Sequence, residues 1–90
     1  MAIDVKVPTI LRTYTGGDKA VSGSGGTVAE VFDDLDARHP GIKERVVDGS
    51  DLRRFVNVYV NDEDVRFTGG LDTALSDGDT IVILPAVAGG

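Results

Sequence analysis

The chain has 90 residues, a formal net charge of −6 and a hydrophobic share of 41%, so it can build one modest core but not two. It contains no cysteine and a single histidine, His39, which excludes disulfides, a thiol nucleophile and metal sites made of thiolates or several histidines. Nucleic acid and anionic membrane surfaces are unsuitable partners, because both are bound through clustered Lys and Arg. Asp4 and Lys6 interrupt the first apolar stretch, so it is not a signal peptide, and no apolar run has the length of a membrane span. We expect a cytoplasmic protein.

Two strands are predicted at the start of the chain. Apolar and charged residues alternate over residues 3–7, which is typical of a half-buried strand, and Pro8 ends it. A loop through Gly16-Gly17 leads to a second strand near residues 19–22. The two strands are expected to form a hairpin.

The clearest helix follows. Thr27 is placed to cap it, with Glu30 three residues later, the spacing of a capping box. One apolar stripe runs along it, made of Val28, Val31, Phe32 and Leu35. Pro40-Gly41 ends the helix, and a further helical turn is expected after it, with Ile42 and Val46 packing inward.

A second hairpin is predicted after residue 55. Residues 56–60 alternate, with three valines on one face and Asn57 and Tyr59 on the other. Residues 61–64 form a polar turn, and we expect residues 65–67 to be a short return strand.

The last strand is predicted over residues 80–84. Before it, Leu71 and Leu75 are expected to anchor one short helical turn, and residues 77–79 to form a tight turn. Valine, isoleucine and leucine fill both faces of the last strand, which favours a central position in the sheet. One helix covers only one face of a sheet, so the other face stays partly exposed.

This uncovered face is the candidate docking surface. Ile81 and Ile83 are expected to face the helix, which leaves Val82 and Leu84 on the outer face beside Tyr59. An exposed apolar patch next to the C-terminal tail would receive a partner protein. The alternative is that surface loops bury these side chains.

Other stretches give weak signals for chemistry. The segment "GSGGT" (residues 23–27) lacks the spacing of a phosphate-binding loop and is better explained as a strand-to-helix turn. The carboxylates of "NDED" and "SDGD" do not fit a calcium loop, and His39 fits a helix end better than a general base. No nucleophile with a base and an orienting group can be named, so the chain is not expected to be an enzyme.

The sequence ends in "PAVAGG". Residues 86–90 can extend about 16 Å from the domain, and no bulky side chain widens the last residues. We expect Val87, Ala88 and Gly89 to thread a narrow channel of another enzyme and to present the carboxylate of Gly90. Adenylation by ATP would activate this carboxylate, and a sulfur donor would then replace AMP to give a thiocarboxylate. The chain itself is expected to bind no cofactor, since ATP is used by the activating partner.

Several motifs together resemble the ubiquitin-like MoaD/ThiS sulfur carriers. They are "LRTYTGG", "VNVYVNDEDV", the L-x-x-x-L-x-D-G-D turn over residues 71–79 and the "PAVAGG" ending. Within that family the chain is most similar to the carriers of actinobacterial cysteine biosynthesis. The resemblance implies an α+β fold, a ubiquitin-like β-grasp with a mixed five-stranded sheet on one main helix over residues 1–85, followed by a flexible tail over residues 86–90.

The resemblance also implies three partner enzymes. An E1-like adenylyltransferase and sulfurtransferase would activate Gly90 and install sulfur there. A pyridoxal-phosphate cysteine synthase would couple the thiocarboxylate to an activated serine, and a metal-dependent peptidase would release cysteine.

Three alternatives remain open at the level of sequence. The same tail chemistry serves sulfur delivery to molybdopterin or thiamine. A ubiquitin-like modifier would instead be conjugated through Gly90 to a lysine of another protein. In a purely structural interaction module the tail would be idle.

Overall fold

The computed structural model describes residues 2–49, 51–53 and 56–85. Within these residues the strands are β1 (Ala2–Lys6), β2 (Ala20–Ser24), β3 (Val47–Asp48), β4 (Asp51–Leu52), β5 (Val56–Val60), β6 (Glu63–Asp64) and β7 (Thr80–Pro85). The helices are α1 (Val28–Arg38) and α2 (Ile42–Val46), with short 3-10 turns η1 (Thr9–Leu11), η2 (Val65–Phe67) and η3 (Gly70–Asp72). The predicted order of the main strands and of the helix is confirmed.

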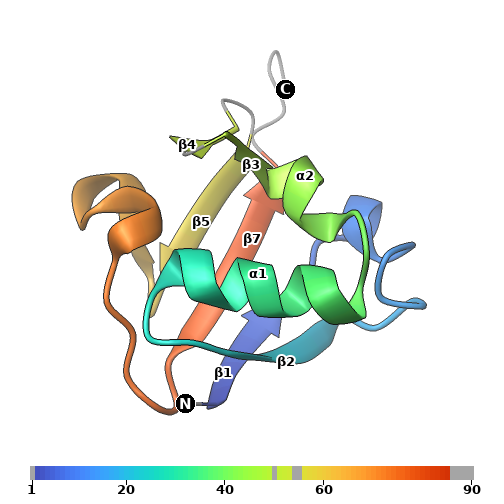
Figure 1. The fold of residues 1–90 in the computed structure, drawn as a ribbon, viewed down its shortest axis with the longest axis horizontal. Helices are drawn as coiled ribbons and strands as arrows, with labels where there is room; N and C mark the ends of the chain where they lie inside the picture. The colour runs from blue at the N-terminus through green and yellow to red at the C-terminus, as the bar shows by residue number, and fades with distance from the viewer. Residues whose placement is uncertain (1, 50, 54–55, 86–90) are drawn as a thin grey trace.

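The main sheet has five strands in the order β2-β1-β7-β5-β6. β1 and β7 are parallel, while β1 with β2, β5 with β7 and β5 with β6 are antiparallel. β7 therefore lies at the centre, as its apolar residues on both faces predicted. Figure 1 shows α1 crossing one face of this sheet, so the α+β β-grasp architecture is confirmed. The division into a domain over residues 1–85 and a tail over residues 86–90 stays a prediction, because residues 86–90 lie outside the described part of the chain.

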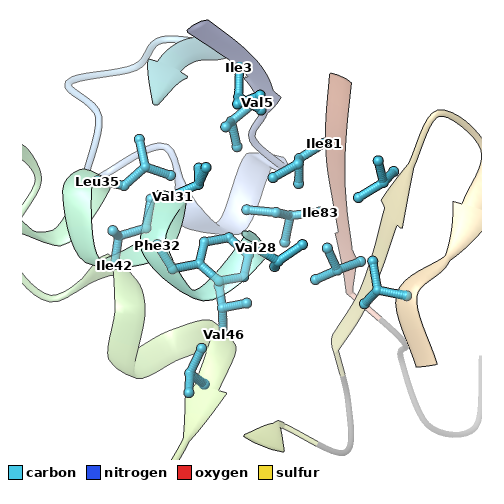
Figure 2. Packing of buried hydrophobic residues seen from close by; sticks show 14 of the residues in the cluster. Ile3, Val5, Val28, Val31, Phe32, Leu35, Ile42, Val46, Ile81 and Ile83 are labelled. Atoms are coloured by element: carbon cyan, nitrogen blue, oxygen red, sulfur yellow. The ribbon is translucent and has the colours of Figure 1, made fainter. Parts of the chain in front are cut away.

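The core lies between α1 and the sheet. Figure 2 shows the α1 stripe meeting the inward side chains of the strands. The fully buried members include Ile3, Val5, Val28, Val31, Phe32, Leu35, Val58, Ile81 and Ile83. The helical stripe and the strand alternation thus bury the residues that their periods indicated.

The N-terminus of α1 is capped almost as predicted. The Thr27 hydroxyl accepts a hydrogen bond from the Glu30 N–H at 3.2 Å. The Glu30 carboxylate reaches back to the N–H of Gly26, at 2.7 Å, rather than to that of Thr27. The box therefore ties down one more residue of the turn that leads from β2 into α1.

The predicted end of α1 and the turn after it are also confirmed. Gly41 has a left-handed φ of 97°, which glycine adopts without strain. The Asp36 carboxylate accepts hydrogen bonds from the N–H groups of Gly41 and Lys43, at 3.0 and 3.3 Å. Ile42 and Val46 are each 1% exposed, so α2 packs inward.

Two predictions for residues 61–75 need correction. Residues 65–67 are not a strand, since the return strand β6 comprises only Glu63–Asp64. The Asp64 carboxylate accepts the N–H of Arg66 at 2.9 Å, which caps η2 and turns the chain away from the sheet. The next helical turn, η3, contains Leu71 but not Leu75, although Leu75 is buried as expected.

A second small sheet was not predicted. β3 and β4 pair as an antiparallel two-residue hairpin, with Val47 opposite Leu52 and Asp48 opposite Asp51. Two residues are too few to show an alternating pattern, so the sequence carried no periodic signal for it.

Candidate docking face and tail

The two faces of β7 differ in exposure as predicted. Ile81 and Ile83 are 0% and 2% exposed and lie against the core. Val82 is partly buried and Leu84 is 45% exposed, so both point to the face that α1 does not cover. The alternation therefore leaves apolar surface on the outer face of the sheet.

Strand register brings the candidate docking residues together. Tyr59 on β5 is directly opposite Val82 on β7, and Leu84 is the next outward residue along β7. We call Tyr59, Val82 and Leu84 the outer-face patch. Lys6 on β1 is opposite Val82 from the other side, and Asn57 is opposite Leu84. The patch thus has a cationic neighbour on one strand and an amide neighbour on the other.

The predicted tail begins where this patch ends. Pro85, the last residue of β7, pairs with Val56, the first residue of β5. Four other predicted site residues, Val87, Ala88, Gly89 and Gly90, lie outside the described residues. The predicted tail, residues 86–90, therefore follows directly on the last described residues of β7, Leu84 and Pro85.

Arg66 is a residue of this region that the sequence did not single out. Its guanidinium donates to the carbonyl oxygens of Arg53 and Val56, at 3.0 and 2.5 Å, and to the side-chain oxygen of Asn57, at 2.8 Å. These bonds fix the start of β5, which is the strand that flanks the end of β7. Arginine can bind several carbonyls in this way because of its planar fork of donors. Residues 65–67 were predicted to be a strand. That prediction named no hydrogen-bond partner for the Arg66 side chain.

Two exposed apolar side chains were also missed. Ile10 in η1 is 67% exposed and Phe67 in η2 is 88% exposed. Neither belongs to an alternating strand or to a helical stripe, so no periodic pattern marked them. Both are more exposed than any member of the outer-face patch.

The weaker candidates have structural roles. The His39 Nδ1 lies 3.2 Å from the carbonyl oxygen of Tyr14, where it joins the end of α1 to the loop after η1. In the "GSGGT" turn, a Cβ on Gly25 would lie 2.7 Å from the Cβ of Glu30, so glycine lets the chain pass close to the first turn of α1. Over residues 2–49, 51–53 and 56–85, no group of three His, Cys, Asp or Glu side chains is placed to hold a metal ion.

Comparison with known proteins identifies the family. The ThiS family model matches residues 5–90. The chain belongs to the ThiS family. The resemblance to MoaD/ThiS carriers that the motifs indicated is therefore confirmed.

The chain is similar over most or all of its length to three known proteins. Sulfur carrier protein CysO of Mycobacterium tuberculosis is 60% identical over 93 residues, which cover 100% of both chains. The solved BexX/CysO complex of Amycolatopsis orientalis contains a chain that is 62% identical with a TM-score of 0.94, covering 99% of this chain and 100% of that one. Small archaeal modifier protein 3 of Haloferax volcanii is 38% identical over 64 residues, or 71% of this chain and 70% of that protein.

None of the helices in the described ranges is long and apolar enough to cross a membrane.

Proposed function

We propose that this protein is a sulfur carrier for cysteine biosynthesis, and that its working group is the carboxylate of Gly90. The observation that carries the proposal is the 60% identity, over all of both chains, to a relative named sulfur carrier protein CysO. The match of the ThiS family model through residue 90 supports the assignment of Gly89 and Gly90 to the tail that the family shares.

The proposed chemistry takes place in partner enzymes. An E1-like enzyme directs the Gly90 carboxylate to the α-phosphorus of ATP, which forms an acyl-adenylate and releases pyrophosphate. Sulfur delivered at the oxidation level of sulfide attacks the acyl carbon, and AMP leaves as the thiocarboxylate forms. The protein acts as a co-substrate, because it supplies the acyl group while the partners supply ATP, sulfur and catalysis.

The tail residues serve access rather than chemistry in this proposal. Val87, Ala88 and Gly89 carry small or moderate side chains that pass through a narrow channel. The proposed tail follows the central strand β7, which is paired with β1 over Thr80–Val82 and with β5 over Ile81–Pro85. A rigid strand up to Pro85 gives the enzyme a fixed starting point for the channel.

The outer-face patch provides the docking surface for the activating enzyme. Tyr59, Val82 and Leu84 adjoin one another by register and lie on the face opposite the core. Apolar surface of this kind, next to the segment that must enter the enzyme, favours a protein partner. The solved BexX/CysO complex shows that a similar carrier associates with another protein.

The sulfur of the thiocarboxylate is proposed to become the sulfur atom of a new cysteine. In a pyridoxal-phosphate cysteine synthase, the thiocarboxylate sulfur takes the place of the activated hydroxyl group on the Cβ of serine, and that group departs. The product is a cysteinyl adduct on Gly90, and a metal-dependent peptidase then adds water to the bond between Gly90 and the cysteine. That hydrolysis releases cysteine and restores the carboxylate. We place these steps in the cytoplasm, in keeping with a chain that contains no cysteine.

Incubation with candidate acceptor enzymes tests this assignment. The thiocarboxylate form is mixed with the cysteine synthase and activated serine, and the chain is then analysed by mass spectrometry of its C-terminal peptide. A cysteinyl adduct on Gly90 is expected. Sulfur transfer only to a pterin or thiazole precursor would reject cysteine synthesis and favour the MoaD or ThiS role. A chain carrying one added alanine after Gly90 is the control, and it should form no adduct.

A protein modifier is the second candidate. The similarity to small archaeal modifier protein 3 and to the solved SAMP1 of Methanosarcina acetivorans, which is 31% identical with a TM-score of 0.83, favours it. Conjugation through Gly90 to lysines would give a ladder of larger species in immunoblots of cell lysate. A single species at the size of the free chain would argue against it.

A further inference from the structure

The two edges of the main sheet differ in length and in protection. β6 forms one edge with only two residues, whereas β2 forms the other with five, Ala20–Ser24. A long edge strand presents unpaired N–H and C=O groups that can bond to another strand, and proteins commonly blunt such edges with charges, proline or bulges. The sequence of β2, AVSGS, has none of these charges and no proline.

The protection of β2 comes instead from α1. The N–H of Ser24 donates to the Asp34 carboxylate at 2.9 Å, and the Arg38 guanidinium donates to the carbonyl oxygen of Ser22. Asp34 and Arg38 form an ion pair at 2.6 Å, four residues apart on the helix. We call these two side chains the edge clamp, because together they occupy backbone groups that point away from β1.

The helix α1 lies close enough to β2 for the side chains of Asp34 and Arg38 to reach the backbone of the strand. Gly23 lies against α1, and a Cβ there would be 2.6 Å from the Cγ1 of Val31. Figure 1 shows β2 running alongside α1, and residues of the two elements are in contact. The missing side chain at Gly23 lets the helix settle where its polar side chains at positions 34 and 38 extend past the edge.

We propose that the outer edge of β2 is a strand-pairing surface that the edge clamp keeps closed, and that the strand it would otherwise take is β2 of a second copy of this chain. The exposed side chains of β2 are small, namely Ala20, Ser22 and Ser24. None of them hinders another backbone that approaches the edge of the strand. A hollow against this edge is lined by Ala2, Ser22, Gly23, Ser24, Asp34 and Arg38.

A second β2 fits this edge by symmetry. In an antiparallel pair, each residue whose backbone faces the partner strand directs both its N–H and its C=O toward it. Two copies of the same strand can therefore exchange these hydrogen bonds around a two-fold axis. Ser22 and Ser24 are two residues apart and both face outward, which is the spacing that such a ladder needs. Each hydrogen bond of the edge clamp occupies one backbone group, the N–H of Ser24 or the C=O of Ser22, that the ladder would need.

The test compares two double variants of the full chain. Asp34→Ala with Arg38→Ala removes the edge clamp. Asp33→Ala with Lys43→Ala removes an ion pair of similar type that joins α1 to the start of α2 and touches no strand edge. Sedimentation is measured from about 10 µM to about 1 mM, the range in which exposed edges associate. We expect the average mass of the clamp variant to rise toward about two-fold that of the monomer, while the wild type and the control stay monomeric.

Two further measurements locate the contact. Amide exchange should slow at Ser22 and Ser24 in the associated clamp variant. Adding Ser22→Pro should return that variant to the monomer, because proline removes an outward N–H at an edge where it is tolerated. If the double variant does not fold, Arg38→Ala alone opens the Ser22 carbonyl and is measured in the same way.

The possible results either support strand pairing at β2 or contradict it. Association with slowed exchange at β2 and rescue by proline supports the proposal. A clamp variant that stays monomeric, a dimer without added protection at β2, or equal association of the control overturns it. None of these results depends on the sulfur-carrier assignment, since no partner enzyme is used.

Discussion

Two adjacent residues of β7 allow docking to be separated from folding. Leu84 is 45% exposed on the outer face, and Ile83 is 2% exposed in the core. Leu84→Ala should therefore weaken docking to the activating enzyme with little loss of stability. Ile83→Val should do the opposite, because it removes one methyl group from the core and none from the outer face.

The size of each effect follows from burial. Complete burial of a leucine side chain is worth about 1.5–3 kcal/mol, and roughly half of Leu84 remains for a partner to cover, so about 1 kcal/mol is at stake. That free energy corresponds to about a five-fold change in an equilibrium constant. Ile83→Val should cost about 1 kcal/mol of folding free energy.

The assay is ATP–pyrophosphate exchange by the E1-like enzyme, with the carrier as the varied substrate. Leu84→Ala should raise KM about five-fold with kcat unchanged, since the acyl group at Gly90 is unaltered. Urea unfolding of both variants supplies the folding free energies. An unchanged KM for Leu84→Ala, or an equal rise for a folded Ile83→Val, would refute docking through the outer-face patch.

Two further predictions concern stability. Thr27→Ala removes the hydroxyl that caps α1 and should lower the folding free energy by about 1 kcal/mol in urea titrations, while Thr27→Ser should restore most of it; equal losses would contradict a capping role. Hydrogen bonds from the backbone N–H of Ser76 and the side chain of Asn61 lower the pKa of Asp79, so its ionised form stabilises the fold. This contribution is present above the unfolded-state pKa of about 3.9 and is lost as the pH falls through the lower folded-state pKa. The urea midpoint of Asp79→Asn should thus lie below that of the wild type at neutral pH and approach it in acid, and a gap that does not change with pH would contradict the linkage.

The strands and the helix could be predicted where their periodic patterns were long. Five alternating residues in β5 and the four-residue stripe of α1 gave the correct inward faces. The outer-face patch followed from the same rule, since Ile83 and Leu84 must point to opposite faces of β7. Each of these elements buries one face, and the spacing of its apolar residues in the sequence indicates which face that is.

Short elements were decided by single hydrogen bonds instead. Val65–Phe67 has the apolar, polar, apolar pattern of a strand, yet the Asp64 side chain caps Arg66 and bends the segment into a 3-10 turn. The β3–β4 hairpin has two residues in each strand, too few for a pattern. The Arg66 bonds to β5 depend on that same bend, so they could not be inferred before the fold was known.

Intact-mass spectrometry of the protein purified from its native cells tests the central proposal most directly. We expect a population whose mass reflects exchange of one carboxylate oxygen of Gly90 for sulfur, and a second population that carries a cysteinyl adduct when the releasing peptidase is absent. A chain whose Gly90 remains an unmodified carboxylate throughout, in cells that depend on it for cysteine synthesis, would contradict the proposed role as a sulfur carrier.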